Sequence, residues 1–470
     1  MNIFWFFFAV VFASPIKLLE PEDDSFYQPT DNFEHEEPGT ILKIRKAPYQ
    51  MKSIHFPVNV SNVWQILVRS EDALGNASAV VSTLFEPYNS NNSRLVSYHV
   101  AEDAPNVNCG PSFAFAGGGF SSVVTKLEMI LIQSALNFGY YVLVPDYEGP
   151  LSAFTVGPTA GYSILNSIRG VLQTDNVTNL SPDADVVLWG FSGGSFASSW
   201  AAGLAPTYAE DLSSNLKGCA LGGWLTNITS MFEIIEGSIF VGLTPNAIAG
   251  MTNQFPEFET YIQSQLTDDR KKSYEEVYGF CLSDSIVNYV FTDFFTGNRK
   301  YFRNGWKMFE DAAFKKFLDI SILGTNETDH IKPDIPIFLF HGEKDEIVPY
   351  KDSQRVYDVW CNEKDGMDSF EFASSTSSGH LLEVFEGSGA ALEFIQRVFE
   401  GKELVKGCKK TSRTTNLFYP GAVTQYINII KSLYKNIRNQ PIGPKDKRSL
   451  FDSEWVDNFE MRSLLGFLES

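Results

Sequence analysis

After its first residues, the sequence has no apolar run long enough to cross a membrane as a helix. It is also poor in basic residues, since 37 Lys and Arg stand against 57 Asp and Glu and give a formal net charge of −20. A nucleic-acid-binding protein needs a basic surface, so this balance excludes that class. No internal repeat or low-complexity tract divides the 470 residues. We therefore expect one large domain with insertions, long enough to bury a large core.

The apolar start of the chain is too short to span a bilayer. Residues 1–13 are rich in Phe and end near small residues, which favours a secretory signal peptide over residues 1–14. A buried N-terminal strand is the alternative. Export is also favoured by N-x-S/T sequences, the acceptors of N-linked glycans, which would lie on the surface if glycosylated. They occur at Asn59, Asn76, Asn91, Asn176, Asn179, Asn227 and Asn326. The sequence thus predicts a secreted, extracellular glycoprotein.

Cysteine and histidine are both scarce. An exported protein should oxidise pairs of its five cysteines and leave one free. These cysteines are Cys109, Cys219, Cys281, Cys361 and Cys408. The six histidines are His35, His55, His99, His330, His341 and His380. This small number limits the residues that could serve as a catalytic base.

The pattern of apolar residues changes near residue 95. Before it, residues 53–100 alternate apolar and polar side chains, as antiparallel strands do. After it, strand and helix patterns alternate, which predicts an α/β fold with a mainly parallel sheet flanked by helices. Residues 224–332 break this alternation and are rich in Phe, Ile, Tyr and Gly. We interpret them as a helical insertion that forms a lid or cap, with a passive helical subdomain as the alternative.

The expected organisation has five segments. A signal peptide over residues 1–14 precedes a core in two parts, residues 15–223 and 333–408, which flank the insertion at 224–332. Residues 409–470 contain many Lys and Arg and are expected to form a basic C-terminal tail or flap. A solvated flap is favoured over a binding patch, because charge runs usually face water.

Gly190-Phe191-Ser192-Gly193-Gly194 has the G-x-S-x-G form of a nucleophile elbow, a sharp turn that holds a serine out for attack. The apolar residues 186–189 before it predict a buried strand, and residues 195–204 after it fit a helix with small side chains close to the turn. This strand–turn–helix context is the one the motif requires. A Gly- and Ser-rich loop before an ordinary helix is the alternative.

A serine nucleophile needs a base, and the base needs an acid that orients it. In this fold class the chain order is Ser, then Asp or Glu, then His. The strand-like residues 334–340 are followed by Glu343, Asp345 and Glu346, and only His380 remains after them. Asp345 is preferred, because a short carboxylate at the tip of a turn reaches a histidine with fewer rotamers to fix. The pattern therefore predicts Ser192, Asp345 and His380 as a catalytic set.

An oxyanion hole needs two backbone N–H donors, and losing one typically lowers the rate by about 10²- to 10³-fold. One donor is expected from Gly193, the residue after the nucleophile. The other should come from the loop after the strand at residues 95–100. Two candidates lie there: residues 101–104 directly follow the strand, and residues 117–119 form a triple-glycine run that lacks the His of an HGGG loop.

Together, these motifs resemble the fungal secreted lipases, the family of Candida antarctica lipase A and the secreted lipases of pathogenic Candida. The resemblance covers about residues 25–410. Besides the elbow, it is carried by Glu102-Asp103-Ala104-Pro105, Cys109-Gly110-Pro111-Ser112, Gly139-Tyr140-Tyr141-Val142, Asp146-Tyr147-Glu148-Gly149 and Asp345-Glu346-Ile347-Val348-Pro349-Tyr350. Two departures are visible: Phe191 stands where Tyr is commoner, and the tail after Cys408 is rich in Lys instead of Pro.

The resemblance implies an α/β-hydrolase fold and a lid built mainly from the insertion. It implies Ser192, Asp345 and His380 as the triad, and the backbone of Asp103 and Gly193 as the oxyanion donors in place of the triple-glycine run. It also implies disulfides Cys109–Cys281 and Cys361–Cys408, with Cys219 free.

The predicted function is a secreted triacylglycerol lipase that cleaves long-chain esters through an acyl-enzyme, with no metal or cofactor. We expect a monomer that meets triglyceride or another lipid ester at an oil–water interface and touches the lipid only peripherally. A soluble carboxylesterase or acyltransferase with the same triad is the main alternative. A serine exopeptidase and a non-catalytic binding module are less favoured alternatives. Activity on emulsified long-chain triglyceride against dissolved short esters separates the first two classes.

Overall fold

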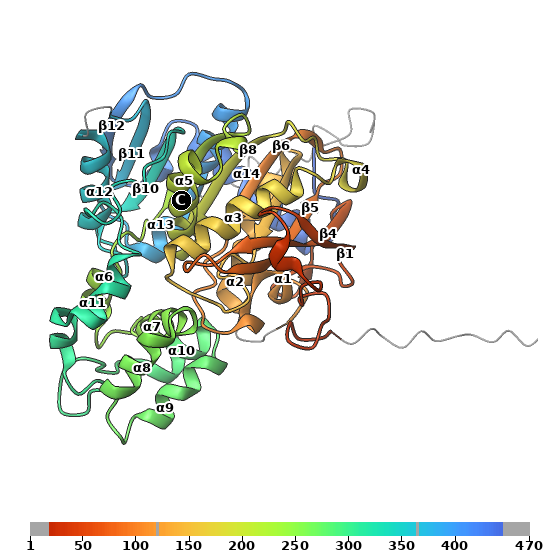
Figure 1. The fold of residues 1–470 in the computed structure, drawn as a ribbon. Helices are drawn as coiled ribbons and strands as arrows, with labels where there is room; N and C mark the ends of the chain where they lie inside the picture. The colour runs from red at the N-terminus through yellow and green to blue at the C-terminus, as the bar shows by residue number, and fades with distance from the viewer. Residues whose placement is uncertain (1–17, 119–121, 363–365, 445–470) are drawn as a thin grey trace, which may run out of the picture.

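The computed structural model describes residues 18–118, 122–362 and 366–444, so the expected signal peptide lies outside the described residues. A ten-stranded sheet has the order β1-β4-β5-β7-β6-β8-β9-β10-β11-β12 (Figure 1). The pairs β1–β4, β4–β5 and β5–β7 are antiparallel, and all pairs from β7 to β12 are parallel. In chain order the strands are β1 (Ile41–Lys46), β4 (Asn62–Glu71), β5 (Ala77–Glu86), β6 (Asn91–His99), β7 (Tyr140–Pro145), β8 (Asp185–Phe191), β9 (Leu216–Gly222), β10 (Ile337–Gly342), β11 (Ser369–Ser375) and β12 (Gly407–Arg413), while β2 (Lys52–Ser53) and β3 (Phe56–Pro57) form a small separate sheet.

Helices cover both faces of the large sheet, which explains why central strands such as β8 are apolar along nearly their whole length. One hydrophobic cluster contains Ile164, Trp200 and Trp360, which lie on α3 (Gly157–Val171), α5 (Gly193–Tyr208) and α12 (Tyr350–Asn362). A second cluster is built from α2 (Val123–Asn137), α13 (His380–Phe399) and α14 (Ala422–Ile437). The short helices α1 (Pro111–Ala114) and α4 (Asp175–Thr178) lie in connections. No helix in the described part of the chain is long and apolar enough to cross a membrane.

A helical lobe separates β9 from β10 and lies beyond one end of the sheet, in green in Figure 1. Its aromatic core includes Phe232, Phe295 and Phe309, whose ring centroids are 5.2–6.1 Å apart. These helices fall within residues 224–332, the range expected for the insertion. Whether they open as a lid stays a prediction. The lobe consists of α6 (Ile228–Ile235), α7 (Leu243–Gln254), α8 (Pro256–Gln265), α9 (Lys271–Glu275), α10 (Leu282–Tyr289) and α11 (Ala312–Asp319).

The C-terminal segment differs from the expected basic tail or flap over residues 409–470. As far as the described residues reach, it is folded onto the body: β12 pairs in parallel with β11, and α14 packs in the second hydrophobic cluster through Ile429. β12 is an edge strand, so Lys409 and Lys410 can be exposed to solvent. For this reason the Lys-rich sequence does not show the apolar pattern from which a strand is predicted. The Nζ atom of Lys410 lies 5.0 Å from the centroid of the Tyr350 ring, which is a cation–π contact.

Candidate active site

Ser192 lies in the sharp turn between β8 and α5, with the strained backbone angles φ 53° and ψ −122°. A turn of this kind directs the serine hydroxyl away from the strand and the helix. The two neighbouring glycines are needed because main-chain atoms come close. An added Cβ would lie 2.2 Å from the Gly194 carbonyl oxygen if placed on Gly190, and 1.9 Å from the His99 carbonyl oxygen if placed on Gly194. This is the geometry that a nucleophile elbow requires.

The structure brings Ser192, His380 and Asp345 together from distant parts of the chain. The Nε2 atom of His380 lies 2.9 Å from Ser192 Oγ, and its Nδ1 atom lies 2.7 Å from Asp345 Oδ2. His380 and Asp345 are buried, whereas Ser192 is half-buried. In this arrangement Asp345 fixes the histidine tautomer that carries its proton on Nδ1, and Nε2 is left to accept the serine proton.

Asp345 sits in the loop after β10 and uses both of its carboxylate oxygens. Its Oδ1 atom accepts the backbone N–H groups of Ile347 and Val348 at 2.9 and 2.7 Å. Its Oδ2 atom faces His380 and also lies 3.0 Å from His341 Nε2. Burial alone would raise the pKa of Asp345, but the charge of His380 and the hydrogen bonds from both histidines hold that pKa well below its usual value. These contacts favour the ionised form of Asp345.

His341 is a residue whose contribution the sequence does not reveal. It lies at the end of β10, is fully buried, and places Nδ1 3.1 Å from Ser353 Oγ while Nε2 faces Asp345. It contacts the orienting acid and not the nucleophile, so it holds Asp345 in place. A histidine four residues before the acid is the only sequence signal for this contact.

His380 begins α13, and its backbone N–H donates to Glu346 Oε2 at 2.7 Å. Its ring lies 4.9 Å from the ring of Phe191, the position where the resemblance expects Tyr more often. Burial lowers the pKa of His380, but the charge of Asp345, the hydrogen bond to it, and the charges of Glu346 and Asp103 together raise the pKa above its usual value. The imidazolium that forms during proton transfer is thus stabilised.

The backbone N–H groups of the two expected oxyanion donors, Gly193 and Asp103, differ in their hydrogen-bond partners. Gly193 is the first residue of α5, where backbone N–H groups have no partner within the helix. Asp103 lies directly after β6 with φ 52°, and its backbone N–H donates to Glu148 Oε1 at 3.1 Å. In this structure the Asp103 N–H therefore donates to a carboxyl group, and its role as a backbone oxyanion donor, which the resemblance implies, stays a prediction.

The side chain of Asp103 instead faces the elbow. An added Cβ on Gly193 would lie 1.9 Å from Asp103 Oδ1, so this oxygen occupies the space beside the Gly193 backbone. Asp103 Oδ1 is buried and makes no hydrogen bond. Burial raises the pKa of Asp103 to about 7, although the charge of His380 acts in the opposite direction. A protonated Asp103 would place an O–H donor beside Gly193, the residue after Ser192.

Further buried carboxyl groups surround this loop. Glu128 accepts the hydroxyl of Tyr98 at 2.7 Å and the backbone N–H of Ala101 at 2.9 Å. Burial raises the pKa of Glu128 to about 8 and holds the pKa values of Glu102 and Glu148 well above their usual range. Burial thus favours the neutral form of these carboxyl groups, and Glu128 and Glu148 support the loop by accepting the backbone N–H groups of Ala101 and Asp103.

The alternative oxyanion loop lies elsewhere. Gly117 and Gly118 have Lys52 and Phe113 as their nearest side chains, and Gly119 lies outside the described residues. His99 is a satisfied histidine of the fold, 2.6 Å from Ser198 Oγ and fully buried. Within the described residues, no group of three or more His, Cys, Asp or Glu is arranged to hold a metal ion.

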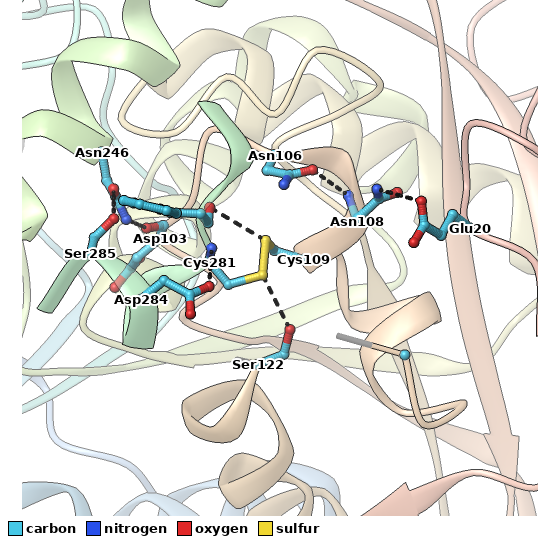
Figure 2. The surroundings of a disulfide bond; sticks show 12 residues. Glu20, Asp103, Asn106, Asn108, Cys109, Ser122, Asn246, Cys281, Asp284 and Ser285 are labelled. Atoms are coloured by element: carbon cyan, nitrogen blue, oxygen red, sulfur yellow. Dashed lines mark hydrogen bonds between the residues drawn. A yellow bond between two sulfur atoms is a disulfide. The ribbon is translucent and has the colours of Figure 1, made fainter. Parts of the chain in front are cut away.

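Two disulfides join Cys109 to Cys281 and Cys361 to Cys408, while Cys219 is buried and free. This is the pairing that the resemblance implies. Cys109 lies just before α1 and Cys281 immediately precedes α10, so the first disulfide ties the helical lobe to the core (Figure 2).

The expected glycosylation sites differ in exposure. Asn59 and Asn227 are half-buried and use their amides: Asn59 Nδ2 donates to the Asn439 carbonyl, and Asn227 accepts backbone N–H groups at the start of α6. A glycan on Asn227 would disturb this helix cap. The remaining candidates are exposed: Asn76, Asn91, Asn176, Asn179 and Asn326.

Comparisons with known proteins point to one family. The family described as Secretory lipase matches residues 116–407. Lipase 5 of Candida albicans is 40% identical over 463 residues, which cover 98% of this chain and 99% of that protein. Lipase A of Arthroderma benhamiae is 32% identical over 435 residues, 91% of this chain and 90% of its own length. The closed-state crystal structure of Candida antarctica lipase A superposes with a TM-score of 0.76 at 27% identity, covering 91% of this chain and 99% of that one. This match confirms the predicted α/β-hydrolase fold.

Proposed function

This chain belongs to the secretory lipase family and is a lipase, an ester hydrolase, and we propose that it hydrolyses long-chain triacylglycerols with Ser192 as the nucleophile. The observation that carries the proposal is the continuous hydrogen-bonded series from Asp345 through His380 to Ser192 Oγ, built on a strained elbow. A buried acid, a buried base and a half-exposed hydroxyl in this order are what acyl transfer requires.

In the proposed reaction, His380 Nε2 takes the proton of Ser192 as Oγ attacks the ester carbonyl carbon. The tetrahedral intermediate collapses when His380 gives this proton to the oxygen of the leaving alcohol, which departs as a diglyceride. Water then enters, His380 removes a proton from it, and the resulting hydroxide attacks the acyl carbon. Return of the proton to Ser192 releases the fatty acid. Asp345 stays ionised throughout and stabilises the imidazolium.

The negative oxygen of each tetrahedral intermediate is held at the start of α5. Gly193 N–H is one proposed donor, because it directly follows the nucleophile and lies at a helix N-terminus. For the second donor we propose the protonated carboxyl of Asp103, since its Oδ1 lies against Gly193 and its backbone N–H already serves Glu148. A neutral acid in an apolar site can donate a hydrogen bond in this way.

The Asp103 proposal predicts a specific pH dependence. Because the pKa of Asp103 is raised to about 7, the protonated donor is present below that pH and is lost above it, so kcat/KM should fall on the alkaline side. In Asp103→Asn the amide donates at every pH, and this alkaline decline should disappear. The acid limb should stay nearly unchanged, because Asp103 is already protonated and uncharged in that pH range.

The measurement is kcat/KM on a dissolved p-nitrophenyl ester between pH 4 and pH 9 for both proteins. Asp103→Leu, which has no donor, is the matched control and should lose about 10²- to 10³-fold at all pH values. An Asp103→Asn profile that keeps the alkaline limb of the unmodified enzyme would show that another group supplies the second donor.

Two measurements test the proposed function directly. A p-nitrophenyl phosphonate should release one equivalent of p-nitrophenolate and leave its adduct on the peptide that contains Ser192, because phosphonates are trapped as analogues of the tetrahedral state. Hydrolysis of emulsified triolein should exceed hydrolysis of dissolved short esters, since the apolar helical lobe favours long acyl chains. Labelling of another residue contradicts the mechanism, and activity on dissolved short esters alone contradicts the long-chain substrate.

We also propose that the protein is secreted, with residues 1–14 removed and with glycans on exposed acceptors. The family to which it belongs and the two disulfides support export to an oxidising compartment. N-terminal sequencing of protein from the culture medium should begin after residue 14. Peptide mapping should find glycans among the exposed acceptors and none on Asn227.

A further inference from the structure

Asn246, on α7 of the helical lobe, is fully buried and uses both ends of its amide (Figure 2). Its Nδ2 atom donates to the carbonyl oxygen of Asp103 at 2.8 Å. Its Oδ1 atom accepts the hydroxyl of Ser285 at 2.5 Å. The chain thus places a buried polar side chain of the insertion on the residue that lines the oxyanion end of the site, 143 positions earlier in the sequence.

Asp103 needs such support because its backbone has a positive φ of 52°, a conformation that costs a non-glycine residue free energy. Two groups hold it from opposite sides. Glu148 accepts the N–H of Asp103 at 3.1 Å, and Asn246 donates to its carbonyl oxygen. With both main-chain groups bound, the Asp103 side chain is left to face Gly193.

The Asp103 carbonyl oxygen fixes which way the Asn246 amide faces, because a carbonyl oxygen only accepts and so requires the NH₂ end. The Ser285 hydroxyl, which can donate or accept, then donates to Oδ1. A flipped amide would set two oxygen atoms against each other at Asp103. Ser285 lies on α10, fully buried, and its backbone packs directly on Gly242 at the start of α7, where an added Cβ would lie 2.5 Å from the Ser285 carbonyl carbon.

The two helices that carry this pair are fixed to the core. Cys281, just before α10, is bonded to Cys109, and its backbone N–H donates to Asp284 Oδ2 at 3.1 Å (Figure 2). On α7, an added Cβ on Gly250 would lie 2.6 Å from the backbone of Phe154 in the core. These contacts leave no space for α7 or α10 to move without breaking main-chain packing.

We propose that Asn246 is a positioning residue for the reaction, which holds the Asp103 backbone so that the oxyanion end of the site is formed, and that Ser285 holds Asn246 in place through its amide oxygen. The inference rests on the proposed function. It means that the α7–α10 part of the insertion belongs to the catalytic scaffold, and that any lid movement is confined to other parts of the lobe.

The test compares kcat and KM on dissolved p-nitrophenyl butyrate for Asn246→Leu, Ser285→Ala and Asn253→Leu. Asn253 is the matched control: it lies on the same helix and donates from Nδ2 to the Pro105 carbonyl oxygen at 3.0 Å, two residues beyond Asp103. Asn246→Leu should lower kcat by about 10- to 100-fold with KM nearly unchanged, because a displaced donor is felt only in the transition state. Ser285→Ala should lower kcat several-fold, and Asn253→Leu should leave it nearly unchanged.

The rate of phosphonylation of Ser192 gives a second readout and should fall in proportion to kcat. If Asn246 had only a structural role, Asn246→Leu and Asn253→Leu would both lower the melting temperature, and their kcat values would not differ from each other. That result would overturn the proposal. If Asn246→Leu does not fold, Ser285→Ala serves as the test in its place. An unchanged kcat in Ser285→Ala would then overturn the proposal. Loss of hydrolysis in Ser192→Ala, measured in parallel, tests the proposed function independently of these variants.

Discussion

Replacing Ser192 with alanine should lower kcat by about 10⁵- to 10⁶-fold on every ester substrate, while the fold is kept. The hydroxyl is the atom that lies 2.9 Å from His380 Nε2, and without it no acyl-enzyme can form. His380 and the oxyanion donors remain, so a residual rate above that of water alone is expected, about 10³- to 10⁴-fold. The loss of kcat is measured with a triolein emulsion and with p-nitrophenyl butyrate.

Ser199→Ala is the control for this experiment. Ser199 lies on the same helix, is fully buried, and donates its hydroxyl to the Phe196 carbonyl oxygen at 2.8 Å, so its loss removes a comparable hydrogen bond away from the triad. Its kcat should stay close to that of the unmodified enzyme, with a modest loss of stability. Retained hydrolysis in a folded Ser192→Ala protein would exclude Ser192 as the nucleophile.

Gly194→Ala should lower the free energy of unfolding by roughly 4 kcal/mol or more, which places it among the most harmful single substitutions. An added Cβ would lie 1.9 Å from the carbonyl oxygen of His99, a main-chain atom at the end of β6 that no rotamer change can move. Relief requires α5 to shift from the sheet, and the elbow would move with it. Denaturant unfolding measures the stability, and kcat should fall in whatever protein remains folded.

Gly279→Ala is the matched control for this stability effect. An added Cβ at Gly279 meets no atom within 4 Å, so the substitution should change the free energy of unfolding by less than about 0.5 kcal/mol. Equal stability of the Gly194→Ala and Gly279→Ala proteins would mean that the contact between α5 and β6 is far looser than the structure describes.

The family, the enzyme class and the α/β-hydrolase fold could be predicted from the sequence, and the comparisons confirm them. The reason is local. The elbow is a contiguous motif with a strand before it and a helix after it, and the small number of histidines leaves one candidate after Asp345. Sequence order therefore suffices to nominate Ser192, Asp345 and His380, and in the structure His380 lies within hydrogen-bonding distance of both Ser192 and Asp345.

The support around the triad could not be predicted in the same way. Glu148 engages the N–H group of Asp103, and Asn246 reaches its carbonyl oxygen from the insertion. Both contacts join residues far apart in the sequence. Glu148 lies in a motif of the resemblance, but that motif does not indicate which backbone group the carboxyl group binds, and Asn246 lies in no motif. The C-terminal strand and helix were not predicted for another reason. Because β12 pairs on one side only, it has the polar composition of a solvated segment.

The position of β12 at the edge of the sheet also bears on self-association. The outer edge of a terminal strand offers unpaired N–H and C=O groups to any other strand that approaches, including the same strand of a second copy. Lys409 and Lys410 are exposed on this strand, so a second copy aligned against it would bring like charges together. The lysines that gave this segment its basic composition thus serve as protection against edge-to-edge aggregation, in a chain whose overall charge is strongly negative.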